Sequence, residues 1–162
     1  MNTYYTTADT PAGAFTMIVD ADETVLASGW TSDVRELTVL ARLSGTPEHR
    51  EQLGVPSKAL ESYVDGDLTA IDAVPVRQAG GEFIAHAWEV LREVRAGEPV
   101  TYTEFAALAG RPAAVRAAAM ACARNAAALF VPCHRILRLD GTLGGFRWGL
   151  PVKRWLLDHE AI

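Results

Sequence analysis

Residues 101–125, TYTEFAALAGRPAAVRAAAMACARN, encode two short helices separated by a glycine turn. Thr101 and Glu104 match a capping box, in which each side chain accepts a hydrogen bond from the other residue's backbone amide. We expect this first helix to end at Gly110. Pro112 suits the first position of a second helix, which is expected to continue to Asn125. The stretch therefore predicts a helix-turn-helix.

Two interpretations of this helix pair remain open from its pattern alone, because short-looped helix pairs are common in all-α domains. Arg116 lies among alanines such as Ala113 and Ala117, so the second helix could approach a nucleic-acid groove closely while one cation projects from it. The other interpretation is a core helix with a solvated arginine. Residues 111–154 hold eight basic side chains against Asp140 alone, although the net charge of the protein is -5. This local basic surface favours polyanions.

The chain before this stretch follows a different pattern. Its first thirty residues alternate as strands do, with turn signals at DTPAG (9–13) and DADET (20–24). They predict a three-stranded antiparallel meander. Helices are expected over 34–43 and from residue 57 to Gly66, with a loop over 44–57 and a linker over 67–80. We therefore expect an α+β support domain at 1–80 and an all-helical domain at 81–162.

Composition narrows the class of protein. The 162 residues are 49% hydrophobic without a long apolar run, and MNTYYTTADTPAGAF (1–15) has no basic start followed by an apolar block. We expect a cytoplasmic protein without a membrane partner. The only cysteines are Cys122 and Cys133, and the four histidines lack metal-ligand spacing. Neither a disulfide framework nor a metal site is expected, and Cys122 is interpreted as a small buried residue.

Cys133 lies in VPCHR (131–135), directly before His134 and Arg135. Two potential positive charges beside a thiol are expected to stabilise its thiolate, which is a nucleophile. A histidine that acts as a base needs a third group to orient its ring, and Glu160, at the edge of the inward stripe of a helix starting near Pro151, is the candidate. A Cys-His-Glu set fits a hydrolase or a group-transfer device, and the fragments do not choose between them.

Together these motifs resemble the O6-alkylguanine-DNA alkyltransferases, also called methylated-DNA–protein-cysteine methyltransferases. The resemblance is strongest over residues 82–161. It rests on VPCHRIL (131–137), Asn125 eight residues before the cysteine, Tyr102 in VTYTEFAALAG (100–110), Arg116 in RPAAVRAA (111–118), and WGLPVKRWLLDHE (148–160).

The resemblance implies a repair reaction that the protein performs once. Cys133 would accept the alkyl group irreversibly from O6-methylguanine in DNA, and also from O4-methylthymine. His134, through a water, would take the thiol proton, and Glu160 would hold the imidazole. Asn125 would bridge the helix pair to the active-site loop, and Tyr102 would donate a proton or hydrogen bond to the departing base.

The resemblance also implies how double-stranded DNA is bound. The alanine-rich helix would enter the minor groove, and Arg116 would fill the gap left by a base rotated out of the duplex. The implied DNA contacts are Arg116, Ala113, Ala117, Arg135 and Thr101. The implied substrate pocket consists of Phe146, Arg147, Trp148, Val131 and Pro132.

The family's fold would give a ribonuclease-H-like N-terminal sheet with helix and a C-terminal helical domain carrying the helix-turn-helix. No cofactor or metal is implied, and we expect a monomer in the cytosol that joins the nucleoid when on DNA. Many relatives have serine and glycine where this chain has Arg147 and Trp148, so we expect methyl to be preferred over bulky adducts. Two rivals remain: a lesion-binding alkyltransferase-like protein without transfer, and a Cys-His-Glu hydrolase.

Overall fold

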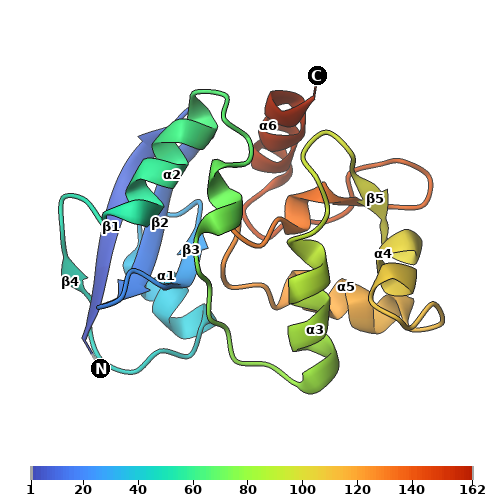
Figure 1. The fold of residues 1–162 in the computed structure, drawn as a ribbon, viewed down its shortest axis with the longest axis horizontal. Helices are drawn as coiled ribbons and strands as arrows, with labels where there is room; N and C mark the ends of the chain where they lie inside the picture. Colours follow the sequence, from blue (N-terminus) through green and yellow to red (C-terminus); the bar gives the residue numbers. More distant parts are fainter. Residues whose placement is uncertain (1, 162) are drawn as a thin grey trace. The chain divides into compact units, whose positions relative to one another are not determined.

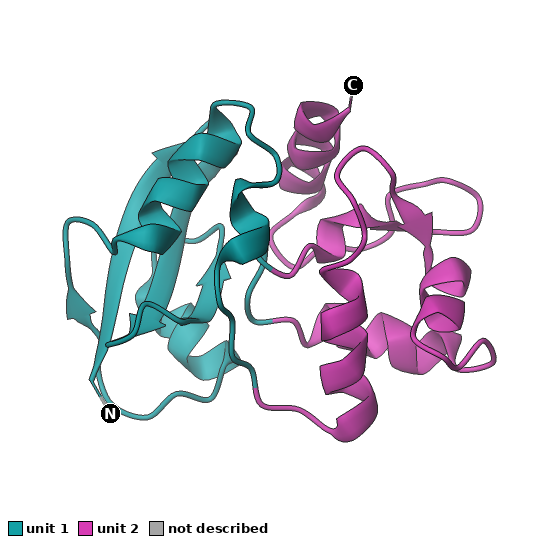
Figure 2. Cartoon of the chain, in the orientation of Figure 1, with its two compact units in different colours: residues 1–78, 126–130 teal, residues 79–125, 131–162 magenta. Residues whose placement is uncertain are grey.

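The computed structural model describes residues 2–161 and divides the chain into two compact units (Figures 1 and 2). One unit comprises residues 1–78 and 126–130, and the other comprises residues 79–125 and 131–162. The predicted division at residue 80 lies close to the first of these crossings. The return of residues 126–130 to the first unit has no counterpart in the sequence-based expectation.

The first unit is built on a sheet whose meander is confirmed. Strands β1 (Thr3–Thr10), β2 (Gly13–Asp20) and β3 (Val25–Gly29) pair antiparallel in chain order. A short strand β4 (Glu48–His49) pairs parallel with β1, so the sheet has four strands in the order β3-β2-β1-β4. The prediction of three strands and of a loop over 44–57 was therefore wrong, because it missed β4. A strand of two residues is too short to show the alternation of apolar and polar side chains that identifies a strand in sequence.

Helices and an ordered connection complete this unit. Helix α1 (Val34–Leu40) is capped by Asp33 and packs against β2 and β3. Helix α2 (Val55–Val64) begins two residues before the predicted start, because Pro56 occupies its first turn. The predicted linker contains a 3-10 turn, η1 (Ala70–Ala73), which contacts α2. The linker is therefore folded against the unit.

Residues 126–130 lie along β3 and are buried (Figure 2). The backbone amide of Ser28 donates to the carbonyl of Ala126 at 2.8 Å, and its hydroxyl donates to the carbonyl of Ala128 at 2.7 Å. The Phe130 ring lies 6.3 Å from that of Phe15 in the core of the unit. The five-residue segment between Asn125 and Val131 is thus held in the first unit by hydrogen bonds to Ser28 and by the packing of Phe130 against Phe15.

The second unit begins with helix α3 (Glu82–Leu91) and carries the predicted helix pair. The elements that follow α3 are β5 (Val100–Thr101), α4 (Tyr102–Leu108), α5 (Val115–Ala123), the 3-10 turn η2 (Cys133–Arg135), β6 (Ile136–Leu137) and α6 (Leu150–Glu160). Strands β5 and β6 pair in parallel, so the expectation of an all-helical domain was wrong. Each strand is two residues long, and the two are more than thirty residues apart in the sequence. Alternation of side chains within a segment cannot predict a pairing of this kind.

The helix pair follows the sequence prediction at its first helix and departs from it at its second. The capping box of α4 is confirmed, with Glu104 N donating to Thr101 Oγ1 at 3.1 Å and Thr101 N donating to Glu104 Oε1 at 3.0 Å. Gly110 adopts a φ of 89°, which favours glycine, at the turn. Helix α5 starts at Val115 and not at Pro112, and it packs against α3 and α4. Among residues 2–161 no helix combines the length and apolar character needed to span a bilayer.

Candidate active site

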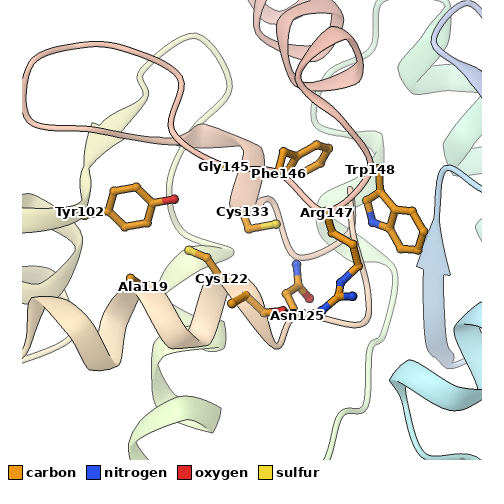
Figure 3. A pocket seen from close by; sticks show the side chains of 10 residues that line it. Tyr102, Ala119, Cys122, Asn125, Cys133, Gly145, Phe146, Arg147 and Trp148 are labelled. Atoms are coloured by element: carbon orange, nitrogen blue, oxygen red, sulfur yellow. Dashed lines mark hydrogen bonds between the residues drawn. The ribbon is translucent and has the colours of Figure 1, made fainter.

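A pocket of about 420 Å³ opens within the second unit, between α5 and the loop that precedes α6 (Figure 3). One wall consists of α5 side chains, and the opposite wall consists of residues 145–148. Cys133 and Tyr102 also line the pocket. The complete lining is Tyr102, Ala119, Cys122, Ala123, Asn125, Cys133, Gly145, Phe146, Arg147 and Trp148.

The backbone around Cys133 is fixed by Asn125. The carbonyl of Val131 accepts two hydrogen bonds at 2.8 Å, one from Asn125 Nδ2 and one from the amide of Cys133. Asn125 lies two residues after the end of α5, so this bond connects the end of the helix to the turn that holds the thiol. Neither Val131 nor Pro132 lines the pocket, contrary to the sequence-based expectation, because both are buried in the turn below it.

Cys133 is buried, with 9% of the residue exposed. Burial raises its pKa, while hydrogen bonding from Asn125 and the charge of Lys153 act in the opposite direction. The expected role of Arg135 in stabilising the thiolate was wrong, because its guanidinium is committed elsewhere. The unliganded site therefore favours a neutral thiol, and a base must accept the proton during reaction.

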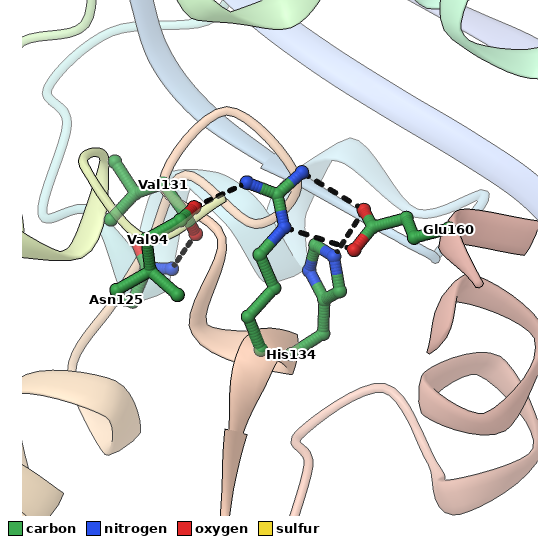
Figure 4. Close-up of polar contacts among 6 residues, drawn as sticks. Val94, Asn125, Val131, His134 and Glu160 are labelled. Atoms are coloured by element: carbon green, nitrogen blue, oxygen red, sulfur yellow. Dashed lines mark hydrogen bonds and ion pairs between the residues drawn. The ribbon is translucent and has the colours of Figure 1, made fainter. Parts of the chain in front are cut away.

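His134 can act as that base, and it lies in a buried cluster with Arg135 and Glu160. Figure 4 shows the contacts of His134 and Glu160. Oε2 of Glu160 lies 2.7 Å from Nε2 of His134 and accepts from Nη2 of Arg135 at 3.0 Å. Oε1 accepts from Nε of Arg135 at 2.9 Å, and Nη1 donates to the carbonyl of Val94 at 2.7 Å. The structure thus brings His134 and Glu160 together across 26 positions of sequence.

The protonation states in this cluster follow from burial and charge. Burial alone would raise the pKa of Glu160, but hydrogen bonds and charge interactions with His134 and Arg135 lower it to about 2. Burial lowers the pKa of His134, against the opposing effect of Glu160. The carboxylate is ionised and the imidazole neutral at pH 7, with its Nε2 proton directed at Glu160. Nδ1 of His134 has no hydrogen-bond partner among the described residues, so it is free to accept a proton.

Tyr102 is half-buried and stays a phenol. Burial and the neighbouring thiols of Cys122 and Cys133 raise its pKa to about 12. Its ring packs against the backbone at Gly144, where a Cβ atom would lie 3.4 Å from Tyr102 Cε2 and where φ is 72°. A side chain at this position would press the loop against the ring. Tyr102 is therefore a neutral hydrogen-bond donor on the pocket wall.

Lys153 was not identified from the sequence, where it counted only as part of the basic window. It is fully buried, and its Nζ donates to the carbonyls of Ile136 at 2.8 Å, Gly145 at 3.3 Å and Leu143. It therefore joins α6 to β6 and to the start of the loop wall. Its spacing from Leu156 and Glu160 places all three on the inward face of α6, and this signal could have distinguished it from a surface lysine.

Arg147 anchors the same loop from its other side. Its Nη2 donates at 3.0 Å to the carbonyl of Ala123, at the C-terminal end of α5, where a cation is favourable. Phe146 and Trp148 flank it along the pocket (Figure 3). The loop wall is thus fixed to α5 through Arg147 and to α6 through Lys153.

The residues predicted to contact DNA differ in their accessibility. Arg116 and Ala113 are exposed, and Ala117 and Thr101 are half-buried. Arg135 is 2% exposed and its donors bind Glu160 and Val94, so its prediction as a DNA contact was wrong. These five residues do not lie among those that line the pocket.

Cys122 also differs from its sequence-based interpretation. It lines the pocket and is only partly buried, although burial of its thiol raises its pKa well above the ordinary value.

Within residues 2–161, no group of three or more His, Cys, Asp or Glu side chains is placed to hold a metal ion. The arrangement of a thiol on the pocket wall, a buried base next to it in the chain and a phenol suits the transfer of a group to sulfur.

Comparisons with known proteins agree with this chemistry. Residues 82–162 match the family profile described as 6-O-methylguanine DNA methyltransferase, DNA binding domain. The chain is 32% identical over 157 residues to a methylated-DNA–protein-cysteine methyltransferase of Shigella flexneri, covering 94% of this chain and 92% of that one. It is 47% identical over 88 residues to the bifunctional transcriptional activator/DNA repair enzyme Ada of Escherichia coli, and this match spans 54% of the chain but only 25% of Ada. The structure of Mycobacterium tuberculosis OGT in complex with DNA superposes with a TM-score of 0.82 at 28% identity, over 97% of this chain and 92% of that one.

Proposed function

The chain belongs to the 6-O-methylguanine DNA methyltransferase family, and we propose on this basis that it repairs alkylated DNA by moving a methyl group from O6-methylguanine to its own Cys133. The observation that supports the assignment most directly is the position of Cys133 on the pocket wall, one residue before a neutral imidazole held by Glu160. The protein is a methylated-DNA–protein-cysteine S-methyltransferase. O4-methylthymine is a second substrate of the same chemistry.

The reaction is a single displacement in which all atoms are accounted for. Cys133 Sγ forms a bond to the methyl carbon as the bond between that carbon and O6 of guanine breaks. The thiol proton passes through a water to Nδ1 of His134, and Glu160 stabilises the resulting imidazolium. Tyr102 donates a hydrogen bond or proton to the departing base. In balance the base gains one proton, equivalent to the one taken from the thiol, and leaves as neutral guanine. The thioether formed at Cys133 is stable, so each molecule reacts once, and no cofactor is needed because the DNA supplies the methyl group and the protein itself accepts it.

Binding of DNA is assigned to the helix pair α4 and α5, acting as a helix-turn-helix. The exposed Arg116 and the small side chains of Ala113 and Ala117 near it support this proposal, because small residues let the backbone of a cationic helix approach the minor groove closely. Since the methylated atom lies inside a duplex, the base rotates out into the pocket and Arg116 occupies the gap. We assign Ala113, Ala117 and Thr101 to the same DNA contact, and we propose that the protein acts as a monomer in the cytosol.

The two units then have separate roles in this proposal. The unit 79–125 with 131–162 binds DNA and carries the acceptor. The first unit, whose sheet of mixed strand direction with packed helices is in keeping with a ribonuclease-H-like arrangement, supports the acceptor turn through residues 126–130.

The decisive experiment is an intact mass measurement after mixing the protein with an oligonucleotide duplex that carries one O6-methylguanine. We expect one added methyl group, located by peptide mapping at Cys133, with about one lesion repaired per protein molecule. Unmodified protein on bound DNA would identify a lesion-binding protein without transfer. Repeated turnover would identify a hydrolase instead.

Lys153→Met tests the cation that holds the loop wall. The substitution leaves three backbone carbonyls without their buried donor, so we expect transfer from free O6-methylguanine base to slow by roughly tenfold to a hundredfold. Arg154→Met is the matched control, because it removes an exposed positive charge one residue away. Single-turnover kinetics with the free base separate the pocket from DNA binding. Equal rates for both variants would contradict a role for Lys153 in shaping the pocket.

Trp148 is expected to restrict the size of the transferred group. Its indole lines the pocket beside Phe146, so methyl should transfer at least roughly tenfold faster than benzyl from the corresponding O6-substituted guanine bases. Trp148→Gly should raise the benzyl rate more than the methyl rate. Rates of inactivation by the two bases provide the comparison, and equal or faster benzyl transfer by the unaltered protein would refute the size restriction.

A further inference from the structure

Helix α5 presents three different faces along its nine residues. Ala118 and Ala121 are buried against the rest of the unit. Ala119, Cys122 and Ala123 line the pocket (Figure 3). A third face is open to solvent.

The open face is defined by Arg116, Met120 and Arg124, which are spaced four residues apart and are all exposed. Residues spaced in this way lie one above another on a helix. Met120 therefore projects between two cations, directly beside the pocket-lining Ala119. It is 44% exposed and is the only large apolar side chain of α5 among the exposed residues.

An exposed thioether at this position is not explained by the packing of α5, whose buried side is filled by alanines. Neither is it explained by the transfer chemistry, which takes place deeper in the pocket. The cations on either side attract a phosphate backbone, and Arg111 adds a further exposed charge before the helix. A helix face that combines cations with one unbranched apolar side chain matches proteins that insert an apolar wedge into the minor groove.

We propose that Met120 is a second wedge, which enters the DNA beside Arg116 and packs against the bases and sugars that border the vacated position. This inference rests on the proposed function. Arg116 fills the gap left by the extruded base, and Met120 keeps the neighbouring step open while that base occupies the pocket below Ala119 and Ala123. The flexible, polarisable side chain adapts to any flanking sequence, as a search for damage requires.

The test compares methyl transfer from a duplex with transfer from the free O6-methylguanine base. Met120→Ala and Met120→Gln should slow duplex repair by roughly threefold to tenfold, because one apolar contact is lost or made polar. Both should leave transfer from the free base unchanged. Met120→Leu, which keeps an apolar side chain of similar volume, should retain most of the duplex rate. Val39→Ala, at an apolar residue of α1 that is 76% exposed, is the control for removing exposed apolar surface.

Two further measurements separate a wedge from a simple DNA contact. Fluorescence of 2-aminopurine placed beside the lesion should increase less with Met120→Ala than with the unaltered protein at saturation, since the neighbouring step stays more stacked. The dependence of DNA affinity on salt should be the same for both, because Met120 binds no phosphate, whereas Arg124→Ala should lower the slope.

The outcomes are distinguishable from failure of the methyltransferase assignment. Transfer from the free base by the unaltered protein tests that assignment without involving Met120. Duplex rates for Met120→Ala and Met120→Gln equal to that of the unaltered protein would overturn the wedge. An equal loss with duplex and free base would also overturn it, because Met120 would then act on the pocket.

Discussion

Cys133→Ala should abolish methyl transfer completely, while DNA that carries O6-methylguanine still binds with an affinity within about twofold of the original. The reason is that the proposed reaction makes the sulfur of Cys133 the bond-forming atom, so no positioning by the remaining pocket replaces it. The variant removes one small side chain that is 9% exposed, so the pocket walls and the exposed face of α5 keep their positions. Intact mass after incubation with the methylated duplex gives the first result, and fluorescence anisotropy of a labelled duplex gives the second.

Cys122→Ala is the matched control for this experiment. Cys122 lines the same pocket, but burial raises the pKa of its thiol well above the ordinary value, and it lies on α5, outside the turn that holds Cys133 and His134. The variant should still take up a single methyl group at Cys133. A methyl group found on the Cys133→Ala protein, or one that maps to Cys122 in the original, would show that the acceptor has been assigned to the wrong sulfur.

Glu160→Gln should cause the second largest loss, affecting both activity and stability. The carboxylate accepts from His134 and from two nitrogens of Arg135 inside the protein, and an amide leaves a buried guanidinium without a counter-charge. Breaking a buried ion pair of this kind costs about 3 to 5 kcal/mol of unfolding free energy. The transfer rate should fall by roughly a hundredfold, because the imidazolium formed from His134 loses its partner. Urea unfolding and single-turnover kinetics measure the two effects, and Asp158→Asn, at an exposed carboxylate on the same helix, is the control.

The pH dependence of stability provides an independent check on Glu160. Its pKa is lowered from 4.5 to about 2 in the folded protein, so its stabilising contribution is fully present above 4.5 and is lost as pH falls through 2. This shift corresponds to about 3 kcal/mol. The difference in unfolding free energy between the original protein and Glu160→Gln should therefore shrink as pH is lowered from 5 towards 2. A difference that stays constant over this range would contradict the assignment of the shift to Glu160.

Local sequence signals predicted the elements whose period lies within a single segment. The meander β1 to β3, the capping box of α4 and the helix α6 were all predictable, because each depends on neighbours a few residues apart. The strands β4, β5 and β6 were not, since each is two residues long and exists only through pairing with a distant segment. The start of α5 was misplaced by three residues because Pro112 fits a turn as well as a first helical position.

The same distinction applies to the site. Cys133, His134, Asn125 and Tyr102 lie in recognisable motifs, and Glu160 was identified by its position at the edge of an inward stripe. The roles of Arg135 and Lys153 could not be inferred from charge alone, since a cation looks the same in sequence whether it faces solvent or a buried carboxylate. Arg135 donates hydrogen bonds to Glu160, and Lys153 donates to backbone carbonyls of β6 and of the loop wall.

The return of residues 126–130 to the first unit, described above, makes the two units inseparable along the chain. In a protein whose domains follow one another along the chain, one cleavage between them separates the domains. Here the segment between Asn125 and Val131 belongs to the first unit and lies immediately before the turn that holds Cys133. Excision of residues 1–78 would strip β3 from five buried residues and leave them as a loose apolar loop next to Cys133. The chain path therefore makes the segment that leads into the turn of Cys133 depend on the fold of the first unit.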